Sequence, residues 1–156
     1  MLMLSSVLGN ESAPLHVRNA AGLAMKNALT ARVRPNRASV SCWFSSRLLQ
    51  DATRQTEYAN RWLQLNVEAK TKIKQDALIT LGSSSQKAGN FASQVVAAVA
   101  GVELPQGQWQ DLIEILLRFV NTADNVNLRI ATLQTIGYIC EVIVSHTVHR
   151  WSRSFI

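Results

Sequence analysis

Two stretches of the chain share one pattern of small and apolar residues at an offset of 39 residues. Residues 92–101 read ASQVVAAVAG and residues 131–140 read ATLQTIGYIC, while AAGLAMKNAL, from Ala20, fits the same frame less closely. An offset near 40 residues is typical of two-helix repeats that stack into a solenoid and bury their apolar faces only against their neighbours. We take each small-residue stretch as a first helix that is followed by a longer, amphipathic second helix.

Composition and periodicity agree with an all-α chain. Hydrophobic residues make up 47% of the 156 residues, aromatic residues only 6%, and Gly and Pro are few, at 7 and 3. Ala and Leu are frequent, which favours helices over strands. Apolar residues recur at helical spacing in six ranges, where we expect helices: 15–29, 55–65, 67–81, 88–102, 109–120 and 127–142.

The strongest helical pattern covers Trp109 to Val120, WQDLIEILLRFV. Its inward positions, at i, i+3, i+4 and i+7 spacing, are Trp109, Leu112, Ile113, Leu116, Phe119 and Val120. Only a few residues separate it from the next helix, which Asp124 or Asn125 can cap, so the two helices should pack antiparallel.

In the helix expected at 67–81, the apolar residues Ile73, Ala77, Leu78 and Leu81 should face the core. The same spacing directs Glu68, Lys70, Lys74 and Asp76 to water. Trp62, in the preceding short helix, fits a packing anchor better than a binding contact.

The net charge of +6 raises the hypothesis of nucleic-acid binding, but most of it lies in two short stretches. Residues 33–50 and the tail from Val144 hold five of the six net charges and no acid, which leaves the rest of the chain nearly neutral. A basic nucleic-acid interface is therefore a weak hypothesis, and no nucleic-acid partner is expected.

No motif for catalysis or for a cofactor is present. The sequence has no GxxxxGK[ST], GxGxxG, GxSxG or HExxH pattern, and LGSSSQK lacks the glycine spacing of a phosphate loop, which favours a linker. Cys42 and Cys140 lie far apart, and the HxxH pair His146 and His149 lacks further metal ligands. The opening run is too short to cross a bilayer. We expect no enzyme activity, no cofactor, no metal and no membrane insertion.

Five segments, in order, resemble the amino-terminal HEAT repeats of the importin-β family of nuclear transport receptors. They read VRNAAGLAMKNAL, YANRWLQLN, IKQDALITLG, ASQVVAAVAGVELPQGQW and TLQTIGYIC. The resemblance covers most of the chain and implies a right-handed superhelical HEAT-repeat α-solenoid that is truncated at both ends. It starts partway through the first repeat, whose first helix should be missing, and stops in the first helix of the fourth.

The resemblance also implies a function. Second helices line the concave side of the importin-β superhelix, where the small GTPase Ran is held in its GTP form. Lys26 and Asn27 match the KN of the pattern AAGLxxKNxL, and Lys70 and Lys74 share one helix face; these four are the candidate Ran-binding residues. From the residues alone, Lys70 and Lys74 fit an ordinary solvated face, and Lys26 and Asn27 fit a helix end.

In the family, other partners are the importin-α adaptor, cargo and nucleoporins, and the location is the cytoplasm and nucleus, including the nuclear envelope and the nuclear pore. A general HEAT-repeat scaffold, such as a vesicle-coat or phosphatase subunit, is the alternative function. Only the five segments that match the family in the same order favour the import receptor over this alternative.

Two segments depart from the family pattern. Within the repeats at 1–143, residues Val33–Gln50 interrupt the expected sequence, and residues 144–156 replace the expected helix. Neither segment has the surrounding periodicity, and the insert should loop out with Trp43 and Phe44 exposed. Codons for Val begin with GT and Gln can be encoded by CAG, which are intron boundaries, so we hypothesise that the insert, and likewise the tail, is translated intron.

Overall fold

The computed structural model describes residues 1–29, 56–122 and 124–152. These residues are helical with short connections, and no strand occurs among them. The helices are α1 (Leu2–Gly9), α2 (Leu15–Leu29), α4 (Val67–Thr80), α5 (Gln86–Glu103), α6 (Leu112–Thr122) and α7 (Val126–Ser152), with a 3₁₀ turn η1 (Leu104–Gln106) and a further helical segment at 56–63.

Side chains at the helix starts supply hydrogen bonds that the first backbone amides cannot make within the helix. Asn66 caps α4 by accepting from the amide of Glu68 at 3.0 Å, and Ser85 caps α5 through Ala88. Asn125 accepts from the amide of Leu128 at 3.2 Å, which confirms the cap expected before α7.

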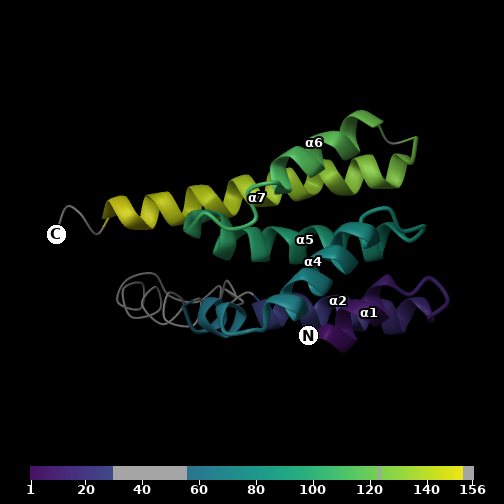
Figure 1. Ribbon diagram of the computed structural model, residues 1–156. Helices are drawn as coiled ribbons and strands as arrows, with labels where there is room; N and C mark the ends of the chain where they lie inside the picture. The colour runs from purple at the N-terminus through teal and green to yellow at the C-terminus, as the bar shows by residue number, and fades with distance from the viewer. Residues whose placement is uncertain (30–55, 123, 153–156) are drawn as a thin grey trace, which may run out of the picture.

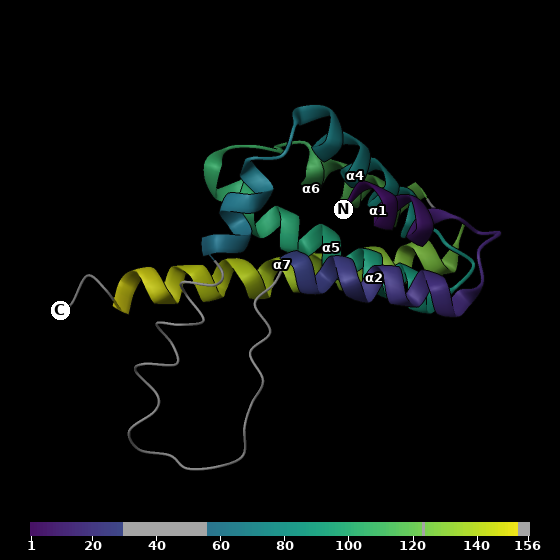
Figure 2. The same ribbon diagram turned by 90° about the horizontal axis from the view of Figure 1, so that it is seen from below.

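The helices form three pairs that stack in sequence order: α1 with α2, α4 with α5, and α6 with α7 (Figure 1). Seen from below, they lie in two layers (Figure 2). The first helices α1, α4 and α6 form one layer, called here the first-helix layer, and α2, α5 and α7 form the second-helix layer. Helix α5 is central, because it packs against α2, α4 and α7.

The 39-residue repeat is present, but the small-residue stretches were expected to be first helices, and this expectation is wrong. The segments from Ala92 and Ala131 lie on α5 and α7, and AAGLAMKNAL lies on α2, so all three belong to second helices. A second helix in this stack packs against its own partner and against the neighbouring second helices. Contact on several sides requires small residues, whereas the strongly amphipathic stretch in α6 suits a first helix with one face in water.

Helix α5 shows this requirement most clearly. Every residue from Val95 to Glu103 is buried, and the segment is rich in Ala, Val and Gly. Gly22 of α2 lies so close to α5 that a Cβ added there would be 2.6 Å from the Cβ of Phe91. The close approach of α2 and α5 therefore depends on the missing side chain of Gly22.

Both ends of the stack differ from expectation. Residues 2–9 form α1, which packs against α2 and α4, so the first helix expected to be missing is present in short form. Helix α7 continues to Ser152 with no break at position 144. The division into residues 1–143 and 144–156 therefore does not coincide with a helix end, and the assignment of the tail to another origin stays a prediction.

The start of α6 was also predicted too early. Trp109 has a left-handed backbone with φ 55°, which no helix residue adopts, and α6 begins at Leu112. Leu112 and Leu116 are fully buried as expected, but Ile113 is 43% exposed. The predictions for Val33–Gln50, Trp43 and Phe44 lie outside the described residues.

Candidate protein-interaction surface

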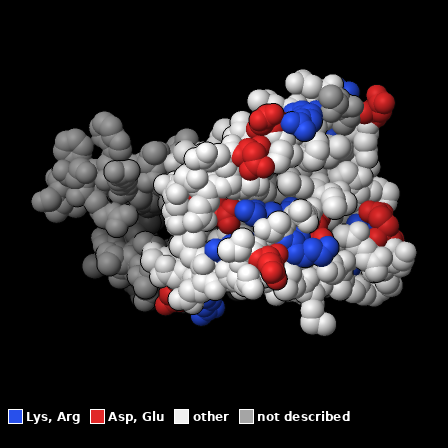
Figure 3. Space-filling view, viewed as in Figure 1, with Lys and Arg blue, Asp and Glu red and all other residues white. Residues whose placement is uncertain are grey.

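The two layers present different surfaces. On the first-helix layer, cations and anions alternate across the face shown in Figure 3. Two of these pairs lie one helical turn apart, Lys72 with Asp76 at 2.7 Å and Arg118 with Glu114 at 3.1 Å. On the second-helix layer, the described exposed charges are Lys87, Arg129 and Glu141, and Lys26 is half-buried. This layer therefore has a positive balance of charge.

Lys26 and Asn27 lie in the last turns of α2, on the second-helix layer. Asn27 is exposed. The carbonyls at the end of a helix carry partial negative charge, which favours a cation such as Lys26 there. The structure thus places this predicted pair on the layer that the resemblance assigns to Ran.

Lys74 instead belongs to a buried network. Its Nζ donates to Glu103 Oε2 at 2.9 Å and lies 4.9 Å from the ring centre of Trp109. The other carboxylate oxygen of Glu103 accepts from Trp62 Nε1 at 3.0 Å. The side chains of Lys74 and Glu103 are 20% and 2% exposed, so the prediction that Lys74 faces water is wrong.

Lys70 also has a partner within the chain, because its Nζ donates to the carbonyl of Leu63 at 2.9 Å. Both lysines lie on α4, a first helix, so their expected position on a second helix is wrong. Asp76 of α4 is buried as well, at 8% exposure, and accepts from Ser5 Oγ at 2.8 Å. The four candidate residues are therefore divided between opposite layers.

A groove that the sequence did not predict lies between α2 and α5, and a few polar side chains stand in its largely apolar lining. Four residues line it, Asn19, Lys87, Asn90 and Phe91, and its volume is about 340 Å³. Asn90 Oδ1 accepts from Gln94 Nε2 at 2.9 Å and from the hydroxyl of Tyr138, on α7, at 3.4 Å. The groove thus adjoins all three second helices. The available signal was the i, i+4 pair Asn90 and Gln94 on a helix rich in small apolar residues.

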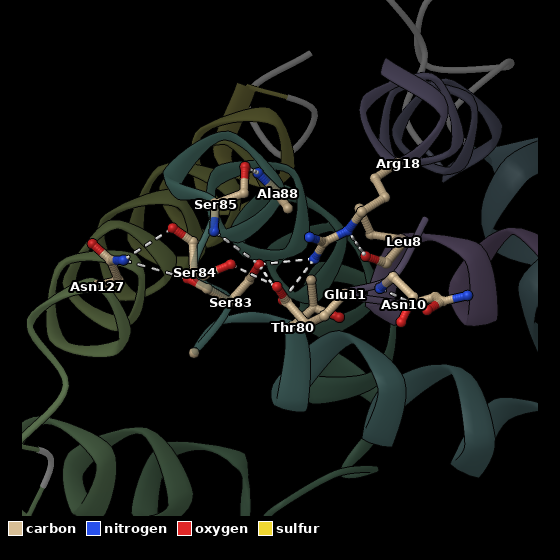
Figure 4. Close-up of polar contacts among 12 residues, drawn as sticks. Leu8, Asn10, Glu11, Arg18, Thr80, Ser83, Ser84, Ser85, Ala88 and Asn127 are labelled. Carbon is tan, nitrogen blue, oxygen red and sulfur yellow. Dashed lines mark hydrogen bonds and ion pairs between the residues drawn. The ribbon is translucent and has the colours of Figure 1, made fainter. Parts of the chain in front are cut away.

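A second polar network joins the turns at one end of the stack (Figure 4). Arg18, only 3% exposed, donates to Glu11 at 2.9 Å, to Ser83 at 2.8 Å and to the carbonyl of Leu8 at 3.0 Å. Hydrogen bonds from Ser83 and Ser84, with the nearby Arg18, lower the pKa of Glu11 to about 2. The segment expected to be a linker is therefore a fixed turn.

The same turn reaches the third helix pair. Asn127 donates to the carbonyls of Ser83 and Ser84 at 3.4 Å, and Asn125 donates to the carbonyl of Gly82 at 3.0 Å. Together with Arg18, these contacts join the three pairs through their turns. The network orients the second helices relative to one another and so supports the surface they form.

The chain is similar to known proteins of one family over most of its length. Residues 1–83 match the model of the importin-beta N-terminal domain. The chain is 41% identical over 143 residues to importin subunit beta-1 of Schizosaccharomyces pombe, which covers 92% of the chain. The chain belongs to the importin-β family. Importin subunit beta-1 of Arabidopsis thaliana is 35% identical over 150 residues, and that of Saccharomyces cerevisiae is 33% identical over 138 residues.

Solved importin-β structures share the fold. An importin beta crystallised in an ammonium sulfate condition has a TM-score of 0.73 and 39% identity over 90% of the chain. A Kap95p structure, in which binding induces the switch loops of RanGDP to adopt the GTP-bound conformation, has a TM-score of 0.74 and 32% identity over 90% of the chain. The fold is thus a HEAT-repeat α-solenoid. The chain spans only 14–15% of the length of the curated relatives.

Within the described part of the chain, neither a cluster of metal-ligating side chains nor a membrane-spanning helix is found. No group of three or more metal-ligating side chains lies close enough together there to hold a metal ion. No described helix combines the length and the apolar character needed to cross a membrane.

Proposed function

We propose that this chain is the Ran-binding part of a nuclear import receptor and binds Ran through its second-helix layer. The observation that carries the proposal is the match of nearly the whole chain to importin-β, including a Kap95p structure whose binding acts on the switch loops of Ran. Lys26 and Asn27 lie on the layer that lines the concave side of the superhelix in this family. The interaction is one of protein with protein and involves no reaction of this chain.

Lys70 and Lys74 have a different part in this proposal. Both already interact within the chain, and both lie on the first-helix layer. We therefore propose that Lys26 and Asn27 contact Ran, while Lys70 holds the segment at 56–63 against α4 and Lys74 holds α4 against α5.

A preference for RanGTP follows from the energetics of the switch loops. If the receptor binds the GTP-bound conformation of these loops, RanGDP must first adopt it, and the measured affinity falls by the fraction of molecules that have done so. The same argument allows binding of RanGDP whose switch loops adopt the GTP-bound conformation, as in the Kap95p structure. The chain should therefore bind both forms but bind RanGTP more tightly.

The wider activity of an import receptor is proposed only for a longer protein. One solved relative is a Kap95:Nup1 complex, which shares 30% identity with this chain but of which the chain covers only 16%. We propose that contacts with nucleoporins, with the importin-α adaptor and with cargo, and movement between cytoplasm and nucleus, depend on later repeats. Ran binding is then the activity that this chain itself should retain.

Calorimetric titration of the purified chain with RanGTP and with RanGDP tests the proposal. Circular dichroism on the same preparation establishes that the helices are formed. Tighter binding of RanGTP is expected. Equal affinity for the two forms, in a folded preparation, would refute the assigned function.

A further inference from the structure

The groove between α2 and α5 contains polar groups without partners. Lys87 is exposed and makes no ion pair with any acid in the described ranges. Asn19 Oδ1 is buried and has no hydrogen-bond partner among the described residues. A buried acceptor that lacks a donor is costly, so a ligand that supplies a donor favours rotation of the Asn19 amide toward the groove.

The orientation of the Asn90 amide is set by its neighbours. Its Oδ1 accepts from both Gln94 and Tyr138, so its NH₂ group is directed away from them, and no described residue accepts from it. The groove thus offers the ammonium of Lys87 and the NH₂ of Asn90 as donors. Rotation about χ2 allows Asn19 to present either a donor or an acceptor.

These groups fit one kind of ligand. A carboxylate accepts hydrogen bonds from an ammonium and an amide together, and a peptide backbone supplies both a donor and an acceptor to an asparagine. Phe91 adds an apolar wall, and about 340 Å³ is in the lower part of the usual range for binding pockets. A nucleic acid would need several cations along a track, whereas this groove contains one.

We propose that the groove lined by Asn19, Lys87, Asn90 and Phe91 binds an acidic, extended segment of a partner protein. Lys87 and Asn90 hold the carboxylate, and Asn19 pairs with the backbone of the segment. The proposal rests on the proposed function, because it places this segment in the partner that the second-helix layer binds.

The test uses the full chain labelled with ¹⁵N and a capped Ala-Glu-Leu-Ala peptide as the probe. Side-chain amide signals of Asn19 and Asn90 report binding at the groove. The Glu peptide should bind about fivefold more tightly than its Gln counterpart, because one partly exposed ion pair contributes up to about 1 kcal/mol. Lys87→Ala should remove that difference, and Arg118→Ala, an exposed cation on the other layer, should leave it unchanged.

Several results would overturn the proposal. These are equal affinity for the Glu and Gln peptides, no response of Asn19 and Asn90, or a single-stranded oligonucleotide that binds more tightly than the Glu peptide. The RanGTP titration separates the two proposals. Peptide binding without RanGTP binding would refute the proposed function and keep the groove, whereas RanGTP binding with no peptide response and no effect of Lys87→Ala would refute the groove alone.

Discussion

Removal of Lys74 should destabilise the chain far more than removal of its partner's charge. In Lys74→Met, the Glu103 carboxylate, 2% exposed, keeps only the hydrogen bond from Trp62. Breaking a buried ion pair in this way costs about 3–5 kcal/mol, and loss of the contact between Lys74 and the Trp109 ring adds about 0.5–1 kcal/mol. Because Lys74 is itself 20% exposed, the lower part of the range, about 3 kcal/mol, is expected.

Glu103→Gln should cost only about 1 kcal/mol. The amide oxygen of Gln can still accept from Trp62 Nε1, and the long side chain of Lys74 can turn its ammonium to water. The double variant Lys74→Met with Glu103→Gln removes both charges, so it should be close to Glu103→Gln alone. We therefore expect a large loss of stability in Lys74→Met, a small loss in Glu103→Gln, and strong coupling between the two sites.

Thermal melting followed by circular dichroism measures these effects. A loss of 3 kcal/mol corresponds to about 6–12 °C in Tm for a chain of this size. Equal losses for the two single variants, with additive effects in the double variant, would show that Lys74 and Glu103 do not act as a buried pair. The premise that Lys74 is a structural residue and not a Ran contact would then fail.

Three further outcomes follow. Gly22→Ala should lower Tm, because the new Cβ would lie 2.6 Å from Phe91 Cβ and overpacking typically costs about 1–3 kcal/mol. Its control, Gly137→Ala, has no atom within 4 Å of the new Cβ and should raise Tm slightly; the opposite order of Tm would contradict the packing of α2 on α5. The pKa of Glu11 is lowered from 4.5 to about 2, so its contribution to stability is present above pH 4.5 and is lost as pH falls toward 2; Glu11→Gln should flatten the acid limb of a stability curve, and an unchanged limb would refute the network. Spliced messenger RNA that still encodes Val33–Gln50 and the tail would sink the intron hypothesis.

Helix positions could be predicted from the sequence because their periodicity is local. The ranges around α2, α4, α5 and α7 follow the spacing of apolar residues, and Asn125 was identified as a possible cap from residue type alone. The short helix α1 was missed because its eight residues, LMLSSVLG, are apolar on most sides and show little helical periodicity. Its stability comes from packing on α2 and α4, which is a tertiary effect.

Local sequence could not predict which helix of each pair carries the repeat pattern, or what the lysines of α4 contact. A 39-residue offset gives the period, but which helix of a pair is central depends on the whole stack. The alternation of Lys70, Lys72 and Lys74 resembles a solvated face, yet Glu103 and Trp109 contact Lys74 from other segments of the chain, and Trp62 donates to the same Glu103. The groove was missed for the same reason, since Asn19 and Asn90 meet only when α2 packs on α5.

The central claim is that the second-helix layer, and not the first, binds Ran. Its most direct test is a calorimetric titration of RanGTP into two charge-reversal variants of equal net charge, Lys26→Glu on α2 and Arg118→Glu on α6. Charge reversal within an interface opposes the partner, whereas the exposed pair of Arg118 with Glu114 contributes little to stability or binding. We predict that Lys26→Glu weakens binding about tenfold or more, while Arg118→Glu binds like the unmodified chain. Unchanged binding by Lys26→Glu together with a loss in Arg118→Glu, in preparations with equal helicity, would contradict the claim.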